Sequence, residues 1–403
     1  MAEPVGEPAD RGDSEAARPA VEPSQIQAAN QSLAWALKRL QGRCQAILVR
    51  EPLIDPVAPL TSDIDLAVVA EVDDLLPERW WPDAVLGPSV PVDLLWIPRE
   101  TLRQPERFAI NGLIVHRVLG SRLVDDSCGE FASFMTELRG ICSRADLRAT
   151  RIEALLRLGE LAVREVGVTW DFPALALFWL QMARASCLAA RLDGLGRFCP
   201  NVYTRPLDYL WPLDAGSKPE LALRFVEDLL LAERPGELIP AVRRLHAVVA
   251  DRFPEPNWPL GMRQSTRSEY RYFRSATELQ WRIEVAEELN LRGAPAAAAY
   301  LLRFWAYALA RIPMVHQRAL EGRDVPYLRP ERSVRADLQA HCPEALEPLE
   351  EVLSGGRGIS ANDVRRCLDS TLHLRQDTLE TLQDFGICLS DQGDWVPFNP
   401  SDS

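Results

Sequence analysis

Two aspartates, Asp63 and Asp65, stand two residues apart in the segment Thr61 to Leu66, which continues as an apolar run. Because side chains alternate across a β-strand, both carboxylates project from the same face. Two carboxylates this close repel each other unless a cation lies between them. Oxygen ligands of this kind suit Mg²⁺, which binds one or two carboxylates together with phosphate oxygens and water. The pair therefore predicts a divalent-cation site.

A third acid, Asp93, stands near the start of the otherwise apolar segment Val92 to Ile97. A charge inside an apolar strand is costly without a partner. If this strand neighbours the first one, Asp93 completes a cluster of three carboxylates, which can hold metal and accept a proton from an attacking hydroxyl. A lone Asp-x-Asp pair is more often a turn or cap feature. The prediction of a site therefore depends on the third acid.

Four short apolar segments, each bounded by Pro, Gly or Asp, predict the strands that position these acids. They cover residues 46–49, 64–72, 92–97 and 122–125. An amphipathic helix is expected before them at 28–43, and a helix or loop at 75–81. From about residue 131 helical periodicity dominates to the end of the sequence. We therefore expect an α+β protein, with a small mixed-sheet domain followed by a large all-α region.

The predicted domain organisation begins with an acidic tail at residues 1–27, whose composition cannot bury enough surface to fold and predicts disorder. After it we expect a sheet domain, a helical substrate-side domain and a second helical region, at 28–130, 131–215 and 216–403. Phe-Trp pairs at 178–179 and 304–305 raise the possibility of a duplicated bundle in the helical part. Chance similarity in an Arg- and Leu-rich sequence is the alternative explanation.

The composition of the chain restricts the classes of function. With 403 residues, 47% hydrophobic and 26% charged, it is typical of a globular protein with a large core. The net charge of −13 repels a polyanion and disfavours general nucleic-acid binding. The most apolar stretch, 172–190, is interrupted by Gln181 and Arg184, which argues against a membrane-spanning helix. The eight cysteines include no CxxC pair and favour reduced thiols in the cytoplasm.

The segments SDIDLAVV and VDLLWI resemble the nucleotidyltransferase superfamily of the DNA polymerase β type, above all its bacterial minimal, aminoglycoside-modifying branch. The resemblance covers about residues 30–215 and is specific at Ser62–Leu66 and Asp93. It implies a Mg²⁺-dependent enzyme that moves a nucleoside monophosphate from an NTP, with ATP favoured, to a small-molecule hydroxyl or a protein side chain. It also implies that Asp63, Asp65 and Asp93 bind the metal, and that Asp93 activates the acceptor hydroxyl.

The chain departs from this family at the phosphate-binding loop. The family places a Gly-Ser pair after the first strand, where backbone N–H groups cradle the triphosphate. Here the strand leads into Arg50, Glu51 and Pro52, and proline lacks one of those backbone donors. Arg50 is therefore a candidate phosphate-binding side chain, because a guanidinium grips two phosphate oxygens; a solvent-facing loop arginine is the alternative. Ser62 is a second candidate, or else a cap or turn hydroxyl.

Two other functions stay open. A degenerate nucleotidyltransferase fold that binds or regulates without catalysis would explain the missing Gly-Ser pair. A toxin-like tRNA-modifying enzyme would use the basic-aromatic segment Arg263–Arg274, in which four arginines share one broad helical face. The net charge opposes the second alternative. We therefore expect a cytoplasmic nucleotidyltransferase that acts on neither membranes nor nucleic acid.

Overall fold

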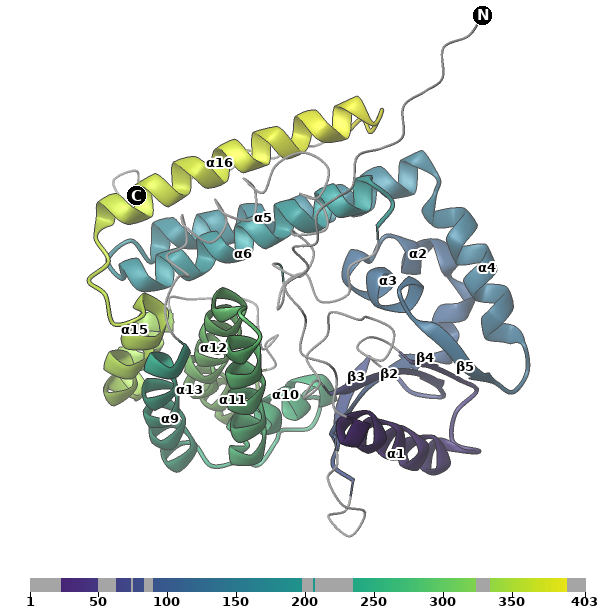
Figure 1. The fold of residues 1–403 in the computed structure, drawn as a ribbon, viewed down its shortest axis with the longest axis horizontal. Coiled ribbons are helices and arrows are strands. Elements are labelled where there is room, and N and C mark those ends of the chain that lie inside the picture. Colours follow the sequence, from purple (N-terminus) through teal and green to yellow (C-terminus); the bar gives the residue numbers. More distant parts are fainter. Residues whose placement is uncertain are drawn as a thin grey trace, which may run out of the picture.

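The computed structural model describes residues 23–49, 63–73, 75–82, 90–197, 206, 235–323 and 334–389. They form a small mixed sheet with its own helices and, beside it, a larger region made of helices (Figure 1). The predicted α+β class, with a small sheet part and a larger helical part, is confirmed at this level.

Five strands make up the sheet in the order β3-β4-β2-β1-β5. They are β1 (Ala46–Val49), β2 (Ile64–Ala70), β3 (Leu76–Trp80), β4 (Val92–Pro98) and β5 (Arg122–Asp126). The strands β2 and β4 run parallel, whereas the other neighbouring pairs are antiparallel. Four strands lie where the sequence predicts them. The exception is β3, which forms an edge of the sheet in a segment expected to be helix or loop.

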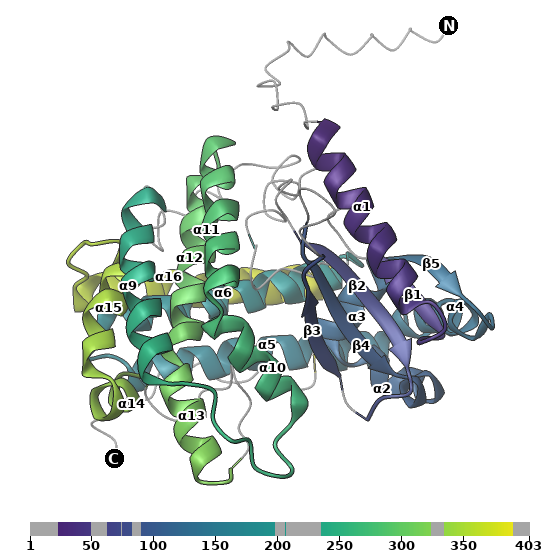
Figure 2. The same cartoon turned by 90° about the horizontal axis from the view of Figure 1, so that it is seen from below.

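Helices cover both faces of the sheet. On one face lies α1 (Pro23–Leu40) (Figure 2). It packs against side chains such as Ile47 and Leu66. The short helix η2 (Arg99–Arg103) follows β4, and the other face is covered by α2 (Pro105–Ala109), α3 (Gly112–Leu119) and α4 (Glu130–Cys142). Because Phe131 and Phe134 of α4 share a core with the sheet, the core of this part extends to Cys142.

The helical region is built around two long helices, α5 (Ala145–Val168) and α6 (Pro173–Gly194), which lie side by side (Figure 1). The other helices are α9 (Pro235–Arg252), α10 (Gln264–Arg274), α11 (Ala276–Leu291), α12 (Pro295–Ala310), α13 (Ile312–Leu320), α14 (Val334–His341), η3 (Pro343–Ala345), α15 (Leu346–Ser354) and α16 (Ala361–Asp384). Residues from α5 to α16 share one apolar core, so the described parts of both predicted helical domains are packed together.

Helix α6 is the most deeply embedded element of this region. Among the described residues it is the one helix long and apolar enough to cross a membrane, yet 89% of its apolar window is buried within the protein. Helix α16 packs closely against the last turn of α6. A Cβ atom at Gly194 of α6 would lie only 2.2 Å from Cδ2 of Leu382 in α16. These contacts are those of a core helix in a globular protein.

Candidate active site between the sheet and the helices

The three predicted acids meet at one end of the parallel strands. Asp65 and Asp93 lie opposite each other on β2 and β4, and Asp63 stands immediately before β2. All three line the same cavity. The structure therefore brings together the carboxylates that the sequence singles out. The two predicted phosphate-binding residues, Arg50 and Ser62, lie outside the described residues.

A fourth side chain, Arg79 of β3, completes this row. It lies opposite Asp93, so that Asp65, Asp93 and Arg79 stand in register across three neighbouring strands. The Nη1 atom of Arg79 lies 2.6 Å from Oδ2 of Asp63 and 2.6 Å from Oδ1 of Asp93. The arginine side chain is only 7% exposed. Its guanidinium thus bridges two of the three acids in a largely buried position.

Helix α11 adds two charged side chains to the cluster. Arg282 donates through Nη2 to Oδ2 of Asp63 at 2.8 Å. Glu278 places Oε2 2.5 Å from Nε of Arg79, and its Oε1 accepts a hydrogen bond of 2.8 Å from Nε1 of Trp81. The acid cluster of the sheet is therefore tied to the helical region through Arg79 and Arg282.

Aromatic rings enclose the two guanidinium groups. The carbon at the centre of the Arg79 guanidinium lies 5.5 Å from the ring centroids of both Trp81 and Tyr272. The corresponding carbon of Arg282 lies 5.8 Å from Tyr272 and 6.0 Å from Trp305. Cation–π contacts of this kind are worth about 0.5–2 kcal/mol each. They help to hold both arginines beside the acids.

The acids form one wall of a cavity of about 920 Å³ between the sheet and helices α10, α11 and α12. Its other walls carry the rings of Trp81, Tyr272, Phe304 and Trp305, together with the arginines Arg117, Arg267 and Arg271. A volume of this size lies within the usual range of about 300–1,000 Å³ for small-molecule sites. The cavity thus joins carboxylates, stacking surfaces and cations in one space.

The environment drives the pKa values of two acids apart. Burial raises the pKa of Asp93 to about 8; the Arg79 guanidinium opposes this shift, and the carboxylates of Asp63 and Asp65 add to it. Burial would also raise the pKa of Asp63, but Arg282 and Arg79 outweigh it and hold that pKa well below its usual range. Asp63 therefore stays ionised, while Asp93 can exchange a proton near neutral pH.

The arrangement of the cluster does not fit a divalent metal ion, although its donor atoms do. Carboxylate oxygens are the ligands that Mg²⁺ prefers. However, no group of three or more His, Cys, Asp or Glu side chains in the described residues is arranged to hold a metal. Nη1 of Arg79 already lies within hydrogen-bonding distance of both Asp63 and Asp93. In this conformation a guanidinium, rather than a metal, balances the charge of these acids.

The basic-aromatic segment forms α10, and its arginines contact the protein itself. Arg267 donates to the carbonyl oxygen of Pro259 at 3.1 Å, and Arg274 to that of Ala250 at 3.1 Å. Arg271 donates to Glu255 at 2.7 Å. These three contacts hold the arginines against the protein itself. The tRNA-modifying alternative gains no support from them.

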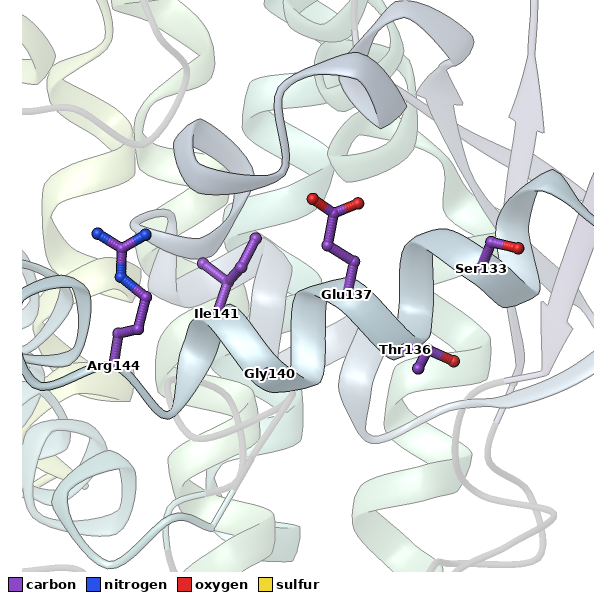
Figure 3. A pocket seen from close by; sticks show the side chains of 6 residues that line it. All are labelled: Ser133, Thr136, Glu137, Gly140, Ile141 and Arg144. Carbon is purple, nitrogen blue, oxygen red and sulfur yellow. The ribbon is translucent and has the colours of Figure 1, made fainter.

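A second hollow, of about 570 Å³, lies along the exposed face of α4 (Figure 3). Its charged side chains are Glu137 and Arg144, and the latter is paired with Glu106 and Asp146. It contains no pair of carboxylates and no aromatic ring. The cavity beside the acid cluster is therefore the better candidate for a functional site.

Sequence reasoning missed the side chains that surround the acids, namely Arg79, Glu278 and Arg282. The alternation within β3 could have indicated Arg79, because Glu78 and Trp80 share one face of a strand and leave Arg79 on the other. Comparison with protein-family models and with curated proteins gives no match for this chain. The resemblance to nucleotidyltransferases therefore rests on SDIDLAVV and VDLLWI, two segments that lie on neighbouring parallel strands.

Proposed function

We propose that this protein is a cytoplasmic nucleotidyltransferase, which moves a nucleoside monophosphate from an NTP to a hydroxyl of a small molecule or a protein side chain. The observation that carries the proposal is the pairing of Asp65 with Asp93 on neighbouring strands, with Asp63 beside them and the cavity in front. ATP is the substrate favoured by the resemblance. The nucleotidyltransferase fold, the magnesium requirement and the acceptor class are parts of the same proposal.

The lining of the cavity suits a nucleotide. A base stacks on aromatic side chains, and the rings of Tyr272, Phe304 and Trp305 lie on the helical wall. Phosphate oxygens accept charge-assisted hydrogen bonds from guanidinium groups, which Arg117 and Arg267 bring to the same space. Arg50, which follows Val49 in the sequence, remains the predicted phosphate-binding side chain, with Ser62 as the second candidate. The helical region thus supplies binding surface and the sheet supplies the acids.

Within this proposal Asp93 takes the proton of the attacking hydroxyl. A general base works best when its pKa lies near the working pH, and burial brings that of Asp93 to about 8. Its side chain keeps 29% of its surface exposed, so a substrate in the cavity can reach it. Asp63, which stays ionised, holds Arg79 and Arg282 in place.

The direct test is transfer of label from NTPs labelled at the α-phosphate. Wild-type protein is incubated with Mg²⁺ and each of the four NTPs, together with aminoglycosides or bulk protein as acceptors. We expect transfer by the wild type and a loss of at least about tenfold in Asp63→Asn/Asp65→Asn, because these carboxylates would hold the magnesium ion that the proposal requires. The matched control is Asp125→Asn, an exposed acid of β5 on the same sheet. Full activity in the double variant would contradict the proposal.

A second candidate function, a binding or regulatory module without catalysis, is favoured by one observation. Arg79 bridges Asp63 and Asp93 and neutralises acids that an active site would keep available. Calorimetry with ATP, CTP, GTP and UTP, followed by analysis of the nucleotide after long incubation, separates the two candidates. A binding module retains NTP unchanged, whereas a nucleotidyltransferase consumes it and releases pyrophosphate.

A further inference from the structure

Arg79 stands in the acid cluster where an external cation would otherwise balance the charge. From this placement we propose that Arg79 competes with divalent cations for Asp63 and Asp93, so that a divalent ion binds these acids only when the guanidinium withdraws. The inference rests on the proposed function, because it concerns the cation that nucleotidyl transfer would require. It deepens that function by naming a resting state of the site, in which the chain supplies its own cation.

The hydrogen-bond geometry indicates that Arg79 is held mainly by charge. A single nitrogen, Nη1, serves both Asp63 and Asp93 at 2.6 Å. The other terminal nitrogen, Nη2, is buried and donates no hydrogen bond within the described residues. A guanidinium grips a carboxylate best when two nitrogens face two oxygens. Arg79 lacks that bidentate geometry with either aspartate, so a doubly charged ion can compete for the same oxygens.

A second carboxylate gives Arg79 a partner after it withdraws. Oε2 of Glu278 lies 2.5 Å from Nε of Arg79, and the glutamate is steadied by the Trp81 ring nitrogen. A buried charge left alone is strongly destabilising, whereas a paired one is tolerated. With Glu278 still beside it, Arg79 can leave Asp93 without becoming an isolated buried charge.

Cation binding measured without nucleotide tests this competition. Mn²⁺ is titrated by calorimetry and by electron paramagnetic resonance into wild type, Arg79→Gln, Arg79→Lys and Arg271→Gln. We expect Arg79→Gln to bind Mn²⁺ more tightly than wild type by about tenfold or more. This is the change in affinity that corresponds to the free energy of one charge-assisted hydrogen bond. Arg79→Lys should lie between the two, because it keeps the charge and loses the fork. The control Arg271→Gln removes a charge from the same cavity and should change the affinity less than about threefold.

Further variants locate the ion and guard against misfolding. Adding Asp93→Asn to Arg79→Gln should abolish the gain in affinity, because Asp93 is one of the two acids that Arg79 contacts. Circular dichroism and melting curves verify that each variant is folded. If Arg79→Gln fails to fold, the proposal is tested by comparing the Mn²⁺ affinity of the wild type with that of Arg79→Lys. Wild-type protein that already binds Mn²⁺ as tightly as Arg79→Lys, or an Arg79→Gln variant with unchanged affinity, overturns the proposal.

The outcome is separable from that of the transfer assay. Tighter Mn²⁺ binding by Arg79→Gln together with no nucleotide transfer in any variant supports the competition and rejects the nucleotidyltransferase. Transfer by the wild type with Mn²⁺ affinity independent of residue 79 supports the enzyme and overturns the competition.

Discussion

Asp193→Asn is expected to lower the free energy of unfolding by about 3–5 kcal/mol, the cost of breaking a buried ion pair by removing one partner. The Asp193 side chain is fully buried in α6. Its Oδ2 lies 2.5 Å from Nε of Arg151 and 2.8 Å from Nε2 of His116, and its Oδ1 lies 2.6 Å from Nη2 of Arg151. Asparagine would keep the volume but bring an NH₂ donor against groups that are themselves donors.

The size of this effect follows from where the network lies. His116 belongs to α3, which covers the sheet, whereas Arg151 and Asp193 belong to the long helices α5 and α6. Arg151 also donates to the carbonyl oxygen of Ala109 at 2.9 Å. Neutralising Asp193 therefore strands a buried guanidinium at the junction between the sheet and the helical region. Urea denaturation followed by circular dichroism measures the loss.

A surface pair of the same residue types is the matched control. Asp171 lies 2.7 Å from Nη1 of Arg335, and both side chains are well exposed, at 71% and 36%. Exposed ion pairs contribute about 0–1 kcal/mol, so Asp171→Asn should change the unfolding free energy by no more than that. Equal losses in the two variants would show that burial does not set the strength of the Asp193 network.

The parts of the fold that the sequence predicts are those specified by local pattern. Continuous apolar runs mark β1, β2 and β4 because central strands are buried on both faces. The acids were recognisable for the same reason: Asp65 and Asp93 interrupt such runs, and a charge there needs a partner. Their placement on neighbouring strands requires only that the two runs pair, and the structure shows that they do.

The partner of these acids was not recognisable from local pattern. The segment LPERW contains Pro77 and two charged residues, and all five of its residues are only partly buried, so it lacks the apolar run of a central strand. It becomes an edge strand because it pairs with β4 on one side and contacts α10 on the other. Arg79 contacts Asp63 and Asp93, and its third acidic partner, Glu278, lies far away along the chain. Contacts of this range arise from tertiary packing, which residue spacing does not encode.

Asp93→Asn is expected to slow nucleotide transfer by about 10²–10⁴-fold, the contribution of a positioned general base. Asparagine keeps the side-chain volume and an oxygen that can accept from Arg79, so the fold and the cavity should persist. The dissociation constant of the NTP should change by less than about threefold, because the proton is removed from the acceptor rather than from the nucleotide. Single-turnover rates and calorimetry with a non-hydrolysable NTP measure the two quantities separately.

Glu269 of α10 is the side chain that makes this prediction discriminating. It lines the same cavity, and burial raises its pKa to about 7, against the opposing charges of Arg263 and Arg117. Judged by its pKa alone, Glu269 would be as suitable a general base as Asp93. It differs in position, because Asp93 stands in register with Asp65 on the sheet whereas Glu269 belongs to the helical wall.

If Asp93 is the base, Glu269→Gln should leave the single-turnover rate within about threefold of wild type, since a group out of reach of the proton contributes little. A large loss in Glu269→Gln together with an active Asp93→Asn would move the chemistry from the sheet to the helical wall.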